Sequence, residues 1–558
     1  MSLLPHIATY ATHSLAIAIT LLVLWKTTSW FLVKQNSPLR HVPGPPVSSW
    51  LYGHAKEIYG SEIAVVQEKW SETYGNTFKY KSVLNQDVLY TADTRAVSHV
   101  FNHTDEYQKP EDVRSSLAEL LAEGLLVVEG EQHRRQKRVM NAAFSPAQIR
   151  ELTEIFIEKS IRLCNVWKDR MPANGELTHV NICEDLSRVT FDIIGLADDL
   201  NLPGFNHDFD SMNPEAKPDP LTNAFKAVFR QSSSMPTIVR MLKKYVPFFR
   251  QFAAKFIQFE RDQASARSVM NRMGMQMIKE KKAEISSAIA AAGSDQKLNS
   301  VNSRNLLTVL IKANMDPSIS PSQRLSDKDV LAQVPTFLVA GHETTSNSTA
   351  WAMFALSQAP EVQHRLREEL RNVPTETPTM DELSALPYLD AVVREVLRLY
   401  APVPIALRTA VRDDVLPLQT PWTDIYGQQH DSINVPGGTL IDIPLLAMNR
   451  SKELWGEDAF EFKPERWSSI PANARSIPGV WSNLTTFLGG PRSCIGYRFT
   501  IIEMKAIIFS LIRAFEFELA IPASSIKATW GLVQRPRIRG EEEKGAQLPM
   551  HLKLYKPL

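Results

Sequence analysis

The chain has 558 residues, of which 44% are hydrophobic and 22% charged, a globular composition that excludes a disordered, collagen-like or multi-span membrane protein. Lys and Arg total 62 against 61 Asp and Glu, so the strongly basic face that nucleic-acid binding requires is not expected. Three cysteines exclude a disulfide framework. Their odd number points to a reducing compartment and leaves room for one cysteine with a chemical role.

The amino-terminal segment has the features of a membrane anchor. Residues 1–25 contain no Lys, Arg, Asp or Glu, and residues 7–25 are about long enough to cross a bilayer. Lys26, Lys34 and Arg40 follow the apolar run. We therefore expect an uncleaved signal-anchor in residues 1–34, with the following chain in the cytoplasm. A cleaved signal peptide and a helix lying on the membrane surface are the alternatives.

A proline-rich segment and a large body follow the anchor. Residues 35–50 contain Pro-Gly-Pro-Pro at positions 43–46, which predicts a stiff hinge before a catalytic body of residues 51–558. Helical spacing occurs in residues 148–167, 327–358, 361–372, 388–400 and 496–515. Strand-like patterns occur in residues 77–82, 88–91, 439–444 and 550–555, and polar loops are expected at 203–220 and 291–305. The predicted fold is mainly α with small β-sheets, behind a single amino-terminal transmembrane helix.

The strongest chemical signal is a glycine-rich loop that contains a lone cysteine. Cys494 stands just before a helical pattern, where the positive end of the helix favours the thiolate form. Gly490 and Gly496 allow close backbone approach to a flat cofactor, Arg492 can meet an anion, and Phe487 can shield the sulfur. A buried inert cysteine is the alternative from these residues alone.

These five residues form the pattern F-x-x-G-x-R-x-C-x-G, which resembles the haem-binding loop of the cytochrome P-450 family. The resemblance implies that Cys494 is the proximal thiolate ligand of the iron of haem b, and that Arg492 binds a haem propionate. Cys164 and Cys183 have no comparable setting, and we interpret both as core residues.

A second motif, Ala-Gly-His-Glu-Thr-Thr at positions 340–345, is similar to the signature on the distal side of haem in this family. The resemblance implies that Gly341 and Thr344 open a groove for dioxygen, and that Thr344 and Glu343 supply an alcohol and an acid for proton delivery. From the residues alone, positions 342 and 343 could begin a zinc H-E-x-x-H site. Ser346 stands where the second histidine is required, which excludes that site.

A third motif joins a helix to a distant arginine. Glu395 and Arg398 are three residues apart and share one helix face, as an ordinary helix ion pair would. In the cytochrome P-450 family they resemble the E-x-x-R motif, which Arg466 would complete. The resemblance implies a buried structural network that holds the chain before Cys494. Trp467 stands where the family more often has phenylalanine.

Further basic residues would hold the haem propionates. Arg408 matches the propionate arginine of the family, while His133 and Lys137 stand at the tryptophan and arginine of its W-x-x-x-R helix. Both replacements can donate hydrogen bonds to a carboxylate. The neighbouring basic side chains form either a solvated face or a docking patch for an acidic reductase; these are Arg134, Arg135 and Arg138.

The resemblance implies a haem-thiolate monooxygenase of the eukaryotic microsomal, fungal-like type. It would receive electrons from NADPH-cytochrome reductase, with cytochrome b5 as a further candidate partner, and lie at the endoplasmic reticulum membrane with its body in the cytoplasm. The segments expected to line the pocket are largely apolar, which predicts a lipophilic substrate such as a terpenoid or another secondary metabolite. These segments are a predicted loop of residues 107–124, Phe337, Ala340, 403–407 and 530–533.

Two alternatives remain from the sequence. A hydroperoxide-rearranging isomerase or lyase would share the fold and need no external electrons, although such enzymes usually lack the acid–alcohol pair that Glu343 and Thr344 form here. A non-catalytic haem or lipid binder would give no product.

Overall fold

A computed structural model of the protein describes residues 37–172, 178–197, 258–291, 306–315 and 323–555, together with Thr20, Trp25, Met212 and Ser320. The predicted membrane span and nearly all of the two predicted polar loops, 203–220 and 291–305, lie outside this part of the chain. Within it, no helix is both long enough and apolar enough to cross a membrane.

Helices make up most of the described structure. Four predicted helical segments, 148–167, 361–372, 388–400 and 496–515, are confirmed within a few residues at their ends, whereas residues 327–358 form two helices. The helices are α2 (Ala55–Gly60), α3 (Val65–Tyr74), α4 (Thr94–Asn102), α5 (Glu111–Leu121), α6 (Gly130–Met140), α7 (Pro146–Arg170), α8 (Ile182–Ala197), α12 (Gln258–Ala291), α13 (Leu306–Met315), α14 (Asp327–Leu331), α15 (Gln333–Gln358), α16 (Pro360–Arg371), α17 (Met380–Ser384), α18 (Pro387–Leu399), α19 (Leu445–Asn449), α20 (Lys452–Trp455) and α21 (Tyr497–Ala514).

The strands form small sheets, and the four predicted strands are confirmed as β1, β2, β8 and β12. The strands are β1 (Thr77–Lys81), β2 (Asp87–Thr91), β3 (Tyr107–Gln108), β4 (Thr178–Asn181), β5 (Ala406–Ala410), β6 (Asp414–Thr423), β7 (Gln429–Val435), β8 (Leu440–Ile443), β9 (Phe515–Leu519), β10 (Ile526–Thr529), β11 (Arg535–Ile538) and β12 (Pro549–Leu554). The largest sheet has the order β1-β2-β8-β5-β3, in which only β2 and β8 run parallel.

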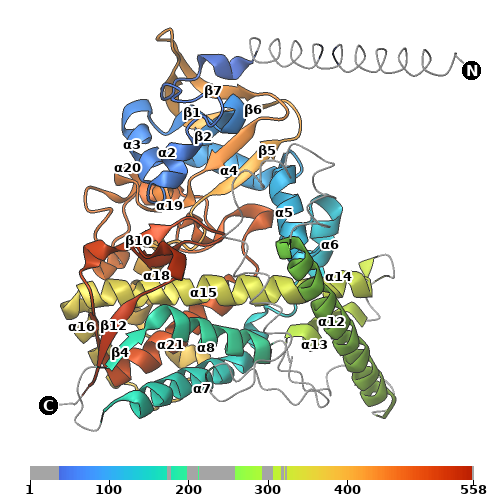
Figure 1. Cartoon of the computed structure of the whole chain (residues 1–558), viewed down its shortest axis with the longest axis vertical. Helices are drawn as coiled ribbons and strands as arrows, with labels where there is room; N and C mark the ends of the chain where they lie inside the picture. Colours follow the sequence, from blue (N-terminus) through green and yellow to red (C-terminus); the bar gives the residue numbers. More distant parts are fainter. Residues whose placement is uncertain are drawn as a thin grey trace, which may run out of the picture.

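The large sheet and the main helical layer lie on opposite sides of α15. Figure 1 shows the large sheet and the β6–β7 ribbon at one end with α2, α3 and α4, while α15 crosses the middle of the molecule. Helices α7, α8 and α21 lie on the far side of α15 from that sheet, and α8 and α21 pack against α15 directly. The main hydrophobic core fills this helical layer, with Trp167, Phe156 and Phe509 almost completely buried.

The central helix begins later than the sequence pattern predicted. Residues 327–358 were expected to form one helix, whereas the structure has α14 ending at Leu331 and α15 beginning at Gln333. Pro335 explains the break, because a proline ring clashes with the carbonyl four residues earlier, here that of Leu331. In the first turn of the new helix α15, the same proline is tolerated because its N–H is not needed.

Part of the predicted hinge is packed on the body. Leu39 and Val42 are buried in the core beneath the sheet, and the backbone N–H of Lys79 in β1 donates to the Pro43 carbonyl at 2.9 Å. A Cβ atom at Gly44 would lie 1.8 Å from the Lys79 carbonyl oxygen, so only glycine allows this close approach. From Pro38 onward, the proline-rich segment is therefore held against β1.

Candidate functional site

The loop before α21 is closed by its own backbone. The N–H of Cys494 donates to the Phe487 carbonyl at 2.9 Å, and Gly496 caps α21. Gly490 has φ +64°, and a Cβ atom there would lie 2.3 Å from the Phe101 carbonyl oxygen. Glycine is therefore required at position 490. At Gly496, by contrast, the nearest atom to such a Cβ is 3.5 Å away on the Phe144 ring, an ordinary contact.

Cys494 retains accessible surface, yet burial among the surrounding protein raises the pKa of its thiol. The backbone hydrogen bond from Gly496 and the charge of Lys137 lower this pKa, but burial outweighs them. The start of α21 therefore lowers the pKa of the Cys494 thiol as expected, but burial raises this pKa by more. Cys164 and Cys183 are buried, and burial raises the pKa of each thiol to about 12, which makes them inert core residues.

A buried cluster of cations lies beside this loop. Arg492 pairs with Glu129 and donates to the Val128 carbonyl at 2.9 Å. Lys109 approaches the same carboxylate at 3.5 Å, and Arg408 is only 6% exposed beside them. Burial lowers the pKa of Lys109 to about 8 and that of Arg408 to about 10, so both remain largely protonated at neutral pH. Three cations thus share one carboxylate.

The two atypical residues of α6 take different positions around this cluster. Lys137 donates to the backbone carbonyls of Pro491 and Ser493 at 2.8 and 3.0 Å, which fastens α6 to the cysteine loop. His133 is buried, and burial together with Arg492 lowers its pKa to about 3. His133 is therefore neutral at physiological pH, and it can meet a carboxylate only as an N–H donor.

The basic residues predicted as a docking patch are partly neutralised. Arg134 pairs with Asp105 at 3.0 Å and with Glu131 at 3.1 Å. Arg135 lies 3.5 Å from Asp329. These pairs leave less free positive charge on α6 than the sequence suggested.

The distal motif lies in the middle of α15, at a change in burial. Residues 340–344 all retain accessible surface, whereas residues 336–339 and 345–353 are buried. The Thr344 hydroxyl donates to the Ala340 carbonyl at 2.5 Å, which leaves its oxygen free to accept a hydrogen bond. Gly341 makes room for α8, since a Cβ there would lie 2.9 Å from Ile194.

Neighbouring elements hold the polar residues of this motif. His342 hydrogen-bonds with the Ser187 hydroxyl of α8 at 2.8 Å, and its backbone carbonyl accepts from Thr190 at 3.2 Å. Glu343 forms an ion pair with Arg535 of β11, a contact that no sequence pattern indicated. The side chains of both partners are largely buried, at 15% and 26% exposed.

A second acid lies between α15 and α21. Glu503 is completely buried, and burial raises the pKa of its carboxyl group well above the usual value. Thr345 of α15 lies near it and lowers this pKa, but burial outweighs that effect. Burial therefore favours the protonated form of Glu503 at the contact between the distal helix and the helix that follows Cys494. A single glutamate in the largely apolar helix α21 carried no sequence pattern that indicated this contact.

The third motif forms a buried network around Glu395. Arg398 donates to both carboxylate oxygens at 2.9 and 2.8 Å, and Arg466 approaches one of them at 3.4 Å. The indole N–H of Trp467 donates to the other oxygen at 3.1 Å. Arg398 also donates to the Asn449 and Ala459 carbonyls, so the network ties α18 to the chain that leads to Cys494.

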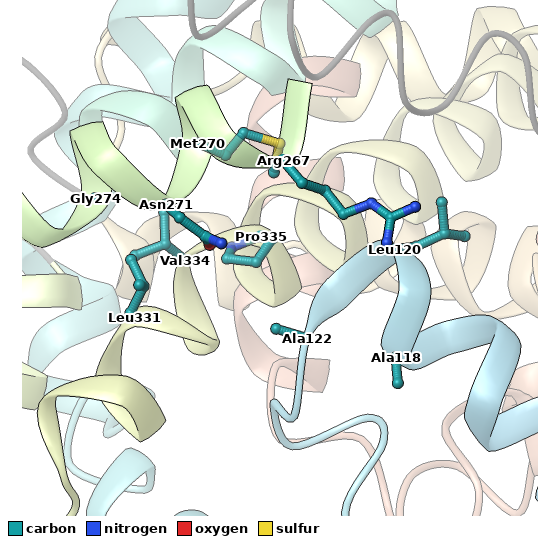
Figure 2. Close-up of a pocket in the computed structure, with 10 residues that line it drawn as sticks. All are labelled: Ala118, Leu120, Ala122, Arg267, Met270, Asn271, Gly274, Leu331, Val334 and Pro335. Carbon is teal, nitrogen blue, oxygen red and sulfur yellow. The ribbon is translucent and has the colours of Figure 1, made fainter. Parts of the chain in front are cut away.

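A small apolar pocket lies at the amino-terminal end of α15. It has a volume of about 60 Å³ and is lined by residues of α5, α12, α14 and α15 (Figure 2). Ala118 and Leu120 belong to the predicted pocket segment 107–124, which was expected to be a loop but contains helix α5. Val334 precedes Thr344 by ten residues, about 15 Å along a helix. The pocket is therefore separate from the residues of the distal motif.

The residues around Cys494 fit a flat, dianionic cofactor. Cys494 keeps accessible surface, and the three largely buried cations beside its loop surround the Glu129 carboxylate. Two propionates would balance the remaining positive charge of this cluster. The Phe144 ring lies near Gly496 and contacts the Phe337 ring of α15 at 5.5 Å, so the cysteine loop and the distal helix are close neighbours. These features agree with haem, which carries two carboxylates and accepts a thiolate ligand.

Comparison with known proteins gives the family. The family model for cytochrome P-450 matches residues 43–537. Cytochrome P-450 monooxygenase 205 of Postia placenta is 53% identical over 97% of this chain and 98% of its own, and monooxygenase 128 of the same fungus is 50% identical over 94% of each. Ganoderic acid synthetase of Ganoderma lucidum is 33% identical over 90% of this chain and 92% of its own. The chain therefore belongs to the cytochrome P-450 family, as a monooxygenase whose cofactor is haem with a cysteine-thiolate iron ligand.

Proposed function

We propose that this protein inserts one oxygen atom from dioxygen into a lipophilic small molecule, such as a terpenoid or another secondary metabolite, with electrons from an NADPH-dependent reductase. Cys494 is the axial ligand in this proposal. The observation that carries it is the accessible Cys494, which has largely buried cations beside its loop and the Glu343–Thr344 motif on the neighbouring helix α15. When bound, haem supplies the iron that activates dioxygen and accepts electrons.

Two groups of residues hold the cofactor in this proposal: one binds the propionates and the other fixes the cysteine loop. Arg408, Arg492 and Lys109 bind the propionates as charged partners, and the neutral imidazole of His133 adds an N–H donor. Lys137 holds the cysteine loop through two backbone carbonyls and places a positive charge near the sulfur. The backbone of Gly490 permits the tight turn, and Phe487 covers the loop from the other side, where its ring contacts Trp481.

Glu343 and Thr344 move protons in this proposal. The Thr344 hydroxyl donates to Ala340, so its oxygen accepts a hydrogen bond and holds a water molecule beside the helix. Glu343 takes protons from solvent at its carboxylate and returns them to this water. A positioned acid or base of this kind contributes about 10²–10⁴-fold to a proton transfer.

The substrate class follows from the apolar character of the predicted pocket segments. Phe337 and Ala406 are buried side chains of α15 and β5, and Val533 is buried in the turn before β11. Leu532 and Val403 are large apolar residues that stay exposed, at 48% and 36%. Apolar side chains of this kind favour an uncharged substrate, because burying an unpaired charge costs more than apolar contacts return.

The amino-terminal segment anchors this enzyme in the endoplasmic reticulum membrane in our proposal. Residues 1–34 form the anchor, residues 35–50 the hinge and residues 51–558 the catalytic domain on the cytoplasmic side. The uncharged segment 7–25 and the positive charges that follow it support this orientation. A tag placed after Leu558 should be digested by protease in intact microsomes, and the protein should resist carbonate extraction. A protected tag would contradict the orientation.

The reaction itself is tested with the full chain and a fungal NADPH-dependent reductase. Extracts containing terpenoid and aromatic scaffolds are supplied under ¹⁸O₂, and products are measured by mass spectrometry. We expect products that gain one ¹⁸O atom only when NADPH and reductase are present. Turnover of a hydroperoxide without NADPH would instead identify a rearranging isomerase or lyase, and a bound ligand without any product would identify a binder.

A further inference from the structure

The ion pair between Glu343 and Arg535 joins two parts of the protein that are 192 residues apart in the chain. Glu343 lies in the middle of α15, whereas Arg535 is the first residue of β11. Both side chains are largely buried, so water screens their attraction less than it would at the surface. Cys183 of α8 also lies within the electrostatic reach of Arg535, which places the arginine beside the contact of α8 with α15.

Arg535 is held firmly by the hairpin that contains it. Strands β10 and β11 pair in antiparallel register, with Thr529 opposite Arg535. The next residue toward the tip, Gln534, bonds to the chain after α18 at two places, since its N–H donates to Pro402 and its side chain donates to Ala401. Trp530, at the other end of the tip, donates its indole N–H to the Ile58 carbonyl at 3.1 Å. The backbone that carries the Arg535 guanidinium group is therefore held in place by these hydrogen bonds.

The tip between these two anchors is the segment that we assign to substrate contact. Residues 530–533 include Leu532, which is 48% exposed, and Val533, which is 2% exposed. A single residue, Gln534, lies between Val533 and Arg535, the ion-pair partner of the Glu343 carboxylate. A ligand that contacts the tip therefore contacts the same stretch of backbone that carries Arg535, the ion-pair partner of Glu343.

We propose that Arg535 is a positioning residue that holds the Glu343 carboxylate in place for proton delivery. Through Arg535, the position of this carboxylate depends on whether a ligand contacts the 530–533 tip. This inference rests on the proposed proton-delivery role of Glu343. The proton balance is unchanged by Arg535, because Glu343 accepts one proton from solvent and passes on one proton, while the arginine stays charged throughout. Its contribution is to fix where the carboxylate lies, not to transfer a proton.

The first test compares three variants of the full-length holoenzyme supplied with reductase. Arg535→Met removes the charge but keeps the length of the side chain, and Arg535→Lys keeps the charge. Arg537→Met is the matched control, because Arg537 lies two residues along the same strand and donates to the Glu542 carbonyl instead. We expect product per NADPH to fall roughly fivefold in Arg535→Met, the lower end of typical coupling between sites, with a larger solvent isotope effect.

The variants with retained function complete this comparison. Arg535→Lys should recover most of the lost coupling, and Arg537→Met should match the wild type in both coupling and isotope effect. A simple loss of hairpin packing would affect the Arg535→Met and Arg537→Met variants alike and would leave the isotope effect unchanged. That result would overturn the proposal.

The second test asks whether Arg535 acts through Glu343. In a double-mutant cycle, Glu343→Gln combined with Arg535→Met should lose no more coupling than Glu343→Gln alone, because the arginine has nothing left to position. Additive losses would overturn the positioning role. Hydrogen exchange provides a readout without turnover: Glu343→Gln should raise amide exchange in residues 530–538 and leave the β6–β7 ribbon unchanged.

The outcomes separate this inference from the function on which it rests. If Glu343→Gln leaves product per NADPH unchanged, the proton-delivery role fails and the inference falls with it. If Glu343→Gln uncouples the enzyme but Arg535→Met does not, the proton-delivery role stands and the positioning role of Arg535 alone is refuted.

Discussion

The indole N–H of Trp467 donates a hydrogen bond to the Glu395 carboxylate at 3.1 Å. Phenylalanine, the more usual residue at this position in the family, has no donor for this bond. Glu395 is completely buried, and two arginines and the Lys463 backbone N–H supply its other hydrogen bonds. The tryptophan that departs from the family pattern therefore adds a fourth donor group to the network before the cysteine loop.

Replacing Trp467 by Phe should lower stability and haem content. The change leaves a buried carboxylate oxygen with one hydrogen bond fewer, which costs about 1–3 kcal/mol. Trp422→Phe is the control, because its indole donates at 3.0 Å to the neutral Ser432 carbonyl, away from the network. Melting temperature and haem per chain are measured for both variants. If the two variants lose equal stability and neither loses haem, the network does not depend on Trp467.

Lys109 should contribute to retention of haem. Lys109, Arg408 and Arg492 have one carboxylate partner, Glu129, so two propionates bring this cluster to neutrality. Lys109→Met removes one charge-assisted hydrogen bond of about 1.5–3 kcal/mol. We expect haem to transfer to apomyoglobin roughly tenfold faster or more, as 1.4 kcal/mol corresponds to a factor of ten. Lys553→Met, on an exposed position of β12, should transfer haem at the wild-type rate.

The Thr344 hydroxyl should control how electrons are used. Thr344→Ala removes the oxygen that accepts a hydrogen bond on α15, so protons are delivered less selectively and peroxide forms in place of product. We expect product per NADPH to fall at least tenfold while haem content stays the same, since a positioned proton donor or acceptor contributes about 10²–10⁴-fold. Thr344→Ser keeps the hydroxyl and should stay coupled. Equal coupling in Thr344→Ala and the wild type would exclude the role.

A buried aspartate in the large sheet predicts how stability changes with pH. Burial raises the pKa of Asp442 from 3.8 to about 6, although the hydrogen bond from Tyr80 acts in the opposite direction. The folded protein therefore holds this proton more tightly than the unfolded chain, and the associated stability is lost as pH rises from about 4 to 6. The loss is about 3 kcal/mol, because each pKa unit corresponds to 1.36 kcal/mol.

Asp442→Asn should remove this part of the pH dependence. The variant should keep its melting temperature better than the wild type as pH rises through this range, because an amide cannot ionise. Asp431→Asn changes an exposed residue of β7 and should follow the wild-type curve. Parallel curves for the wild type and Asp442→Asn would show that Asp442 does not titrate in this range.

The sequence predicted the local parts of the fold and site better than the long-range ones. Glu395 and Arg398 share a helix face by spacing alone, and the loop around Cys494 is a continuous motif. Lys109 and Arg535 are single basic residues without a pattern, and their importance comes from partners far along the chain. No local rule of spacing contains that information.

The differences in secondary structure have similar causes. Ribbon β6–β7 went unpredicted although Leu416 and Ile433 are buried, because Pro417 and Pro421 interrupt the strand pattern of β6. Helix α5 was expected to be a loop because only Leu121 of its residues is fully buried, which weakens the apolar periodicity. Packing against neighbouring elements, not intrinsic propensity, determines the secondary structure of both segments.

The most direct test of the account is the spectrum of the reduced protein with carbon monoxide. Wild-type protein should show the red-shifted Soret band of thiolate-ligated haem, and Cys164→Ala and Cys183→Ala should show the same band because both cysteines are buried core residues. Cys494→Ala should lose this band. A Cys494→Ala protein that kept the band would contradict the assignment of Cys494 as the haem ligand.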